Sequence, residues 1–165
     1  MSRNDLSSAE VLVLLATTPQ RLAALTAGVD SVELQGSPDP NEWSGNDTLA
    51  HLRACADVWG GCIARILSED EPSWRAVNPR TWIVQTDYRD LEFHASLRAF
   101  VQQRRDLLVR LEPLPPDDWL RAATVSGEGK IRQRDVFFYA RRMARHELTH
   151  VKQMARIIER IHEDG

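Results

Sequence analysis

Three histidines in this chain have the spacing that a metal-binding site requires. His146 and His150 are four residues apart, within the pattern H-E-x-x-H over residues 146–150, and His51 lies much earlier in the chain. Two imidazoles at positions i and i+4 lie on one face of a helix, where both can bind one ion. If His51 joins them from a second helix, three ligands leave one position for water or substrate. That count is typical of a catalytic metal site rather than a structural one.

Helical periodicity places the three histidines on apolar faces. With about 100° between successive residues, His146 and His150 share a sector with most of the apolar side chains of their helix. His51 shares its face with Cys55, Val58, Trp59, Cys62 and Ile66. Because buried polar groups need partners, three imidazoles at one depth predict a divalent ion between them. The alternative is that each is a core histidine in an ordinary hydrogen bond, which is the commoner role of a single buried histidine.

Residues close to these histidines are candidates for secondary roles. Cys55 lies one turn after His51 and is a candidate fourth ligand, although such a cysteine is more often a small core residue. Glu147 is the nearest acid in sequence, and its position on the helix suits a group that orients a ligand. His94 is expected at the boundary of the core, and His162 suits the last turn of its helix because a cation there complements the helix dipole.

The pattern H-E-x-x-H is also the zinc signature of many metalloproteases. In its extended form a third histidine follows six residues after the second, and this chain has Arg156 at that position. Glu159 and Glu163 follow His150 too closely to act as the downstream glutamate of other such proteases. No edge strand is predicted that would hold an extended peptide. Protease is therefore the least favoured of the possible functions.

Four helices are predicted to position these residues, over 7–27, 47–68, 87–111 and 131–162. Ser7 or Ser8 is expected to cap the first and Asn46 or Asp47 the second, and Pro19 should bend or divide the first. No segment has the alternation of a half-buried strand. We expect one all-α domain over residues 1–165, a four-helix bundle with long connections. The link of about twenty residues between the second and third helices is long enough to make them parallel.

Within this bundle, the second and fourth helices are predicted to be antiparallel neighbours. His51 lies early in one and His150 late in the other, so antiparallel packing brings all three imidazoles to one end of the bundle. Trp59 lies on the apolar face of the second helix, and Trp43 precedes the cap of that helix. We therefore expect structural roles for both tryptophans.

Composition excludes several classes of protein. The chain has 165 residues, of which 42% are hydrophobic and 27% charged, so it is neither disordered nor embedded in a membrane. A formal charge of −3 argues against general binding of nucleic acid, which needs a basic face. The start of the chain does not have the pattern of a secretory signal. Cys55 and Cys62, two helical turns apart, are too distant to bridge, and we expect a cytoplasmic protein.

Three segments resemble the DinB/YfiT-like superfamily of metal-binding four-helix bundles. Residues 43–52 read WSGNDTLAHL and look like the tryptophan, helix cap and first histidine of that family. Residues 140–153 read ARRMARHELTHVKQ and look like its paired histidines followed by glutamine, and residues 114–119 read LPPDDW, like the segment before its last helix. The resemblance implies an up-down-down-up bundle and metal ligation by His51, His146 and His150. Relatives of that kind include thiol S-transferases that use low-molecular-weight bacterial thiols and a mycothiol-dependent maleylpyruvate isomerase.

Three functions remain open from the sequence. The first is an enzyme, a metal-dependent transferase or hydrolase acting on a small molecule, with a low-molecular-weight thiol as a candidate substrate. The second is a non-catalytic bundle that binds metal or a small ligand, and the third is a structural or dimerising bundle, including a homodimer. A cavity open to solvent beside the metal favours the enzyme, and a closed, fully ligated site favours a structural role. Zinc and nickel are the first candidates, with iron, copper and manganese as alternatives, because imidazole suits several ions.

Overall fold

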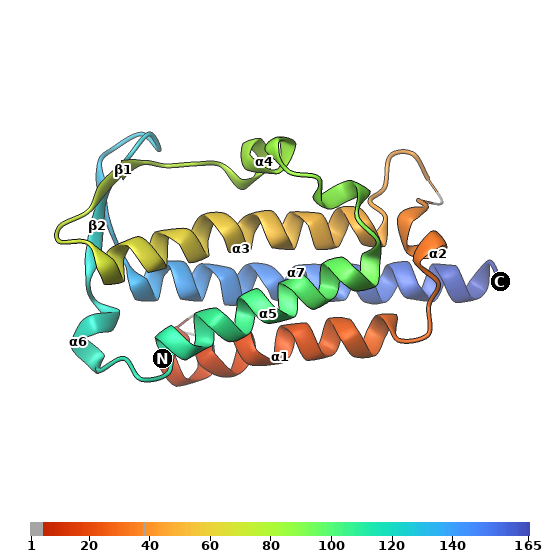
Figure 1. The fold of residues 1–165 in the computed structure, drawn as a ribbon, viewed down its shortest axis with the longest axis horizontal. Helices are drawn as coiled ribbons and strands as arrows, with labels where there is room; N and C mark the ends of the chain where they lie inside the picture. The colour runs from red at the N-terminus through yellow and green to blue at the C-terminus, as the bar shows by residue number, and fades with distance from the viewer. Residues whose placement is uncertain (1–4, 38) are drawn as a thin grey trace.

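Four long helices form the body of the molecule. The computed structural model describes residues 5–37 and 39–165, so residues 1–4, part of the segment considered for a secretory signal, lie outside the described part. The long helices are α1 (Ser8–Thr26), α3 (Gly45–Ser68), α5 (Phe93–Leu111) and α7 (Val136–Glu163). In Figure 1, α1 and α7 run in one direction along the bundle, and α3 and α5 run in the other. The predicted all-α, up-down-down-up bundle is confirmed, as is the antiparallel packing of α3 against α7.

The helix starts are set by local capping. The Ser7 hydroxyl accepts a hydrogen bond from the backbone N–H of Glu10, whose carboxylate accepts one from the backbone N–H of Ser7. Ser44 and Asp47 form the same reciprocal capping box at the start of α3. The expectation that Asn46 or Asp47 caps this helix was therefore wrong, because Ser44 lies three residues before an acid that completes the box. Helix α3 begins two residues earlier than predicted.

The connections contain short helices that the sequence prediction left out. They are α2 (Ser31–Gln35), α4 (Pro79–Trp82), the 3₁₀ turns η1 (Ile83–Gln85) and η2 (Tyr88–Asp90), and α6 (Pro116–Trp119). Helix α5 consequently begins at Phe93, later than the predicted 87, because residues 88–90 form a separate turn. The start of α4 has a recognisable signal, since Asn78 caps it by accepting from the N–H of Arg80, and Pro79 follows the cap.

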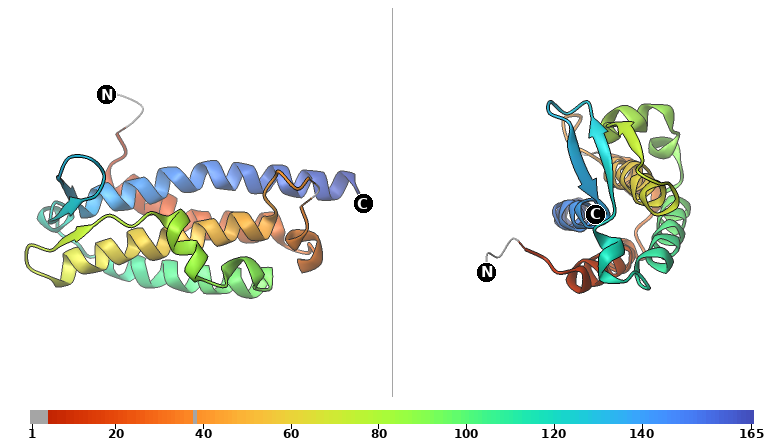
Figure 2. Two further views of the ribbon diagram at one scale, coloured as in Figure 1. Left: turned by 90° about the horizontal axis from the view of Figure 1, so that it is seen from above. Right: turned by 90° about the vertical axis from the view of Figure 1, so that its left-hand side faces the viewer.

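A small sheet closes one end of the bundle, and it corrects the expectation that no strand is present. Strand β1 (Ser73–Arg75) pairs in parallel with β2 (Ala122–Ser126), and β2 pairs antiparallel with β3 (Arg132–Asp135). Figure 2 shows this sheet beside the first turns of α7. Strand β3 occupies residues predicted as the start of the last helix. Helix α7 instead begins at Val136, where the Asp135 carboxylate accepts from the N–H of Phe138.

The link between α3 and α5 passes over α3, as Figure 1 shows, and is fixed there by Asp57. One carboxylate oxygen of Asp57 accepts hydrogen bonds from the indole N–H of Trp82, at 3.1 Å, and the hydroxyl of Tyr88, at 2.5 Å. The other accepts from the amide of Gln103 on α5 at 2.7 Å. This half-buried carboxylate ties the link to two parallel helices, α3 and α5.

The core lies between the four helices and contains Trp59 but not Trp43. Trp59 is buried, which confirms its structural role, and Trp43 is half-buried. Pro19 lies inside α1 and does not divide that helix. Both cysteines are free thiols. None of the helices in the described residues combines the length and the hydropathy needed to cross a membrane.

Candidate metal centre

The three predicted histidines converge between α3 and α7. The Nε2 atoms of His51 and His146 are 3.0 Å apart, and the Nε2 atoms of His146 and His150 are also 3.0 Å apart. The ring centroids of His51 and His150 are separated by 4.7 Å. The rings therefore direct their Nε2 atoms toward one region from two antiparallel helices, as their positions in the sequence predicted.

The helices place these rings at the edge of the core. His51 is seven residues into α3 and is 8% exposed, whereas His146 and His150 are half-buried. The centre of the buried face of α7 passes through Glu147, Val151 and Met154 rather than through the histidines. The apolar sector assigned from periodicity was thus rotated by part of a turn, since Glu147 is buried whereas its neighbour His146 and His150 are half-buried.

Gln153 fixes the orientation of His150. The Nδ1 atom of His150 is 2.8 Å from Oε1 of Gln153, so Nδ1–H donates to that oxygen and the lone pair of the neutral ring is on Nε2. The indole of Trp43 stacks on the same ring at 9° and 6.0 Å between centroids. Trp43 is therefore not fully exposed, and it contacts the site as well as packing beside the start of α3.

His146 lies at the centre of the group, between His51 and His150. Its ring meets that of Trp59 edge to face, at 5.2 Å between centroids, and its buried Nδ1 has no hydrogen-bond partner among the described residues. A single proton on Nε2 of His146 would have to serve both 3.0 Å contacts, to His51 and to His150. A cation resolves this conflict because it accepts a lone pair from each ring.

Burial and mutual repulsion keep these imidazoles neutral. Desolvation, followed by the charges of His150, Arg80 and Arg89, lowers the pKa of His51 to about 4. Desolvation also lowers the pKa of His146 to about 3, assisted by the two other histidines, Arg142 and Arg80, and it lowers the pKa of His150. A neutral imidazole is the form that binds metal, so the site is in its ligating form at neutral pH.

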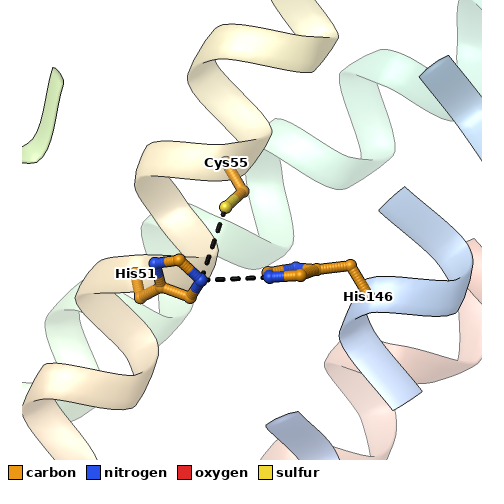
Figure 3. A group of neighbouring side chains, drawn as sticks. All are labelled: His51, Cys55 and His146. Carbon is orange, nitrogen blue, oxygen red and sulfur yellow. Dashed lines mark hydrogen bonds between the residues drawn. The ribbon is translucent and has the colours of Figure 1, made fainter. Parts of the chain in front are cut away.

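Cys55 lies beside two of the three histidines. Its Sγ is 3.7 Å from Nε2 of His51, and the donor atoms of His51, Cys55 and His146 all lie within 4.8 Å of one another. Figure 3 shows these three side chains pointing toward one another from α3 and α7. Desolvation raises the pKa of the Cys55 thiol to about 12. The thiol is therefore protonated in the protein as it stands, and it would have to lose this proton to become a ligand.

The donor set fits a divalent transition metal. Ligand nitrogens of a tetrahedral zinc ion are about 3.3–3.4 Å apart when the Zn–N distance is about 2.05 Å. The observed separations of 3.0 Å are close to this value. Three neutral imidazoles are suitable ligands for zinc, nickel, copper or iron. Such an ion would also remove the need for one proton on His146 to serve two contacts.

Glu147 does not belong to this site. Its side chain is 3% exposed and forms a buried ion pair with Arg104 of α5, which is 2% exposed. Nη1 of Arg104 lies 3.0 Å from Oε2 of Glu147, and Nη2 contacts Oε1. The expected role of Glu147 in orienting a ligand is therefore not borne out, because the carboxylate is directed into the core and both of its oxygens are occupied. A metalloprotease needs this glutamate beside the metal, so the geometry argues further against that function.

His94 lies at the boundary of the core, as the sequence predicted. His94 is half-buried on α5, and its Nε2–H donates to the backbone carbonyl of Val29 at 2.9 Å. This hydrogen bond to the backbone gives His94 a structural role, and His94 makes no contact with the three converging histidines in the described part of the chain.

Two pockets adjoin the histidines along α7. One of about 620 Å³ is lined by Trp43, His150 and Gln153, together with Arg156 and Arg160. The other, of about 370 Å³, is lined by Phe138, Arg141, Arg142, Arg145 and His146. Both volumes lie in the range of small-molecule sites, so the histidine group is accessible to ligands rather than enclosed.

The metal-free protein should lose stability as the pH falls from about 6.5 toward about 4. The pKa of His51 is about 4 and that of His146 about 3 in the folded protein, against 6.5 in an unfolded chain. Between these values the unfolded chain binds more protons than the folded one, so acid favours unfolding. Urea unfolding across this window measures the effect.

A double variant provides the control for this pH dependence. His51→Gln/His146→Gln should show a shallower fall in the free energy of unfolding than the natural protein. Equal slopes in the natural protein and the double variant would show that these imidazoles do not titrate with depressed pKa values.

Comparison with known proteins places this architecture among known bundles. The family model described as DinB superfamily matches residues 14–154. YfiT from Bacillus subtilis, described as a probable metal-dependent hydrolase with an unusual four-helix bundle topology, has a similar solved structure, with a TM-score of 0.73 and 14% sequence identity. That match covers 98% of this chain and 93% of YfiT. No curated protein sequence matches the chain significantly.

Proposed function

Because this chain belongs to the DinB superfamily, we propose that it is a metal-dependent enzyme for a small-molecule substrate, with a divalent ion held by His51, His146 and His150. The observation that carries this proposal is the convergence of three neutral Nε2 donors beside two open pockets. The description of YfiT as a probable metal-dependent hydrolase supports the same reaction class.

The proposed reaction is attack by water or a thiol on a small electrophile. A divalent ion in such a site supplies Lewis acidity, which lowers the pKa of a water or thiol that it contacts. Other residues of the chain hold the histidine rings in position. Gln153 keeps the Nε2 lone pair of His150 available, and the rings of Trp43 and Trp59 hold His150 and His146 in place. A low-molecular-weight thiol is the proposed co-substrate, and the resemblance of the sequence to its family supports this choice.

A non-catalytic metal site is the second candidate, because Cys55 is close enough to complete the ligand set. Three imidazoles and a thiolate make a closed tetrahedral site of the kind used for structure or storage. The distance of 3.7 Å between Sγ of Cys55 and Nε2 of His51 is the observation that favours it.

A turnover assay on metal-loaded protein tests the proposed enzyme. The natural protein, loaded separately with zinc, nickel, manganese or iron, is incubated with low-molecular-weight thiols and a generic electrophile, and separately with activated esters in the absence of thiol. We expect turnover with at least one combination and its loss in His150→Ala.

The variant Cys55→Ser separates the two candidates in the same assay. In the enzyme, Cys55→Ser should retain both metal and turnover, because the fourth position belongs to water or substrate. Absence of turnover in every combination, together with a large loss of metal affinity in Cys55→Ser, would replace the enzyme by the closed site.

A further inference from the structure

Arginines surround the pocket beside His146. Arg141, Arg142 and Arg145 line this pocket of about 370 Å³ together with Phe138 and His146. Three of its five lining residues are therefore cationic, although the formal net charge of the chain is −3. The local charge therefore differs in sign from the charge of the whole protein, and a local excess of cations attracts anionic ligands.

Aromatic rings hold one of these arginines in place beside the histidine group. The guanidinium carbon of Arg142 lies 4.8 Å from the ring centroid of Trp59 and 5.9 Å from that of Phe138. Trp59 in turn packs edge-on against His146. Stacking on an aromatic face fixes the plane of a guanidinium while leaving its N–H groups free to donate. Arg142 is thus positioned beside the histidine group before any ligand binds.

Among the described residues, the arginines of this pocket have no acidic partners. In the part of the chain that the structure describes, the ion pairs involve Arg65, Arg89, Arg104 and Arg160, and neither Arg142 nor Arg145 is among them. Arg145 is exposed and makes no side-chain hydrogen bond within the described residues. Guanidinium groups that are neither paired nor buried are available to bind carboxylate or phosphate in a bidentate manner.

We propose that the pocket beside His146 binds the anionic group, carboxylate or phosphate, of the substrate through Arg142 and Arg145. This inference rests on the proposed function, because it specifies the charge of the substrate that the proposed enzyme binds at this site. An anion held there lies against the ring of a proposed metal ligand, so the reacting part of the molecule is placed beside the ion. The substrate class is a small organic anion rather than a neutral or cationic molecule.

Titration of the arginine side-chain signals tests the anion site without relying on turnover. The Nε–Hε resonances of the metal-free natural protein are followed by NMR while succinate or inorganic phosphate is added in separate experiments, which distinguishes a carboxylate site from a phosphate site. We expect saturable shifts of the Arg142 and Arg145 signals with at least one of the anions. Arg142→Gln or Arg145→Gln should weaken binding about tenfold, the effect of losing one charge-assisted hydrogen bond.

Matched variants keep this test separate from the test of the metal centre. Arg98→Gln removes an exposed arginine of α5 and should leave anion affinity unchanged. The two pocket variants should bind zinc as the natural protein does, and His150→Ala should lose zinc but keep the anion shifts. Shifts that do not saturate with either anion, or equal weakening in Arg98→Gln, would overturn the anion site while leaving the metal centre intact.

Discussion

Replacing Glu147 by alanine is expected to lower the free energy of unfolding by about 3–5 kcal/mol, because it leaves the Arg104 guanidinium buried without its counter-charge. Both side chains are almost fully buried, at 2% and 3% exposure, so water cannot replace the lost partner. Urea unfolding of the metal-free protein measures this change. Glu159→Ala, which removes an exposed acid from the same helix, should stay within about 0.5 kcal/mol of the natural protein.

The ion pair is needed because of a proline in α1. Pro19 has no N–H, so the backbone carbonyl of Leu15, four residues before it, has no partner within the helix. Nη1 of Arg104 donates a hydrogen bond to this carbonyl at 2.9 Å. This places the positive charge of Arg104 in the core, where the Glu147 carboxylate balances it. The glutamate of the H-E-x-x-H pattern is therefore linked, through Arg104, to a proline-containing helix.

The isosteric variant Glu147→Gln separates this structural role from a catalytic one. It should lower stability by less than Glu147→Ala, since the amide oxygen still accepts one hydrogen bond from Arg104. Turnover per folded molecule should stay close to that of the natural protein. Loss of turnover at unchanged stability would contradict the structural role and return Glu147 to the active site.

The bundle and the convergence of its histidines could both be predicted from the sequence. The i, i+4 spacing of His146 and His150, and the early position of His51 in its helix, depend only on helical geometry and on the direction of the chain. The long link with Pro72 and Pro79 was sufficient to make the second and third helices parallel. Such features are local or topological, and tertiary packing does not alter them.

Features that depend on distant partners were not predictable in the same way. Strand β1 is three residues long and is defined by pairing with β2, where Trp74 lies opposite Val125, about fifty residues later. The ion pair of Glu147 could not be predicted without knowing that α5 directs Arg104 into the core. The signal that was available is Pro19, because a proline inside a helix leaves a carbonyl that some buried donor must satisfy.

Replacing His146 by alanine is expected to have the largest effect on metal binding. His146 is the central ring, with Nε2 at 3.0 Å from both other Nε2 atoms, so its loss leaves two donors that no longer surround one point. Removing a group that merely orients a ligand costs about 10–100-fold in metal affinity, and loss of the ligand itself should exceed this. Titration calorimetry with zinc and nickel measures the affinities.

A graded series around His146 shows whether the effect comes from ligation or from packing. Gln153→Ala removes the acceptor for Nδ1–H of His150 and should weaken binding within the range of about 10–100-fold. His94→Ala and His162→Ala, which remove histidines outside the group, should leave metal affinity unchanged. Metal at about 100 times its Kd should stabilise the natural protein by about 2.7 kcal/mol, and this increment should vanish in His146→Ala. Retention of the increment in His146→Ala, or its loss in His94→Ala, would place the metal elsewhere in the protein.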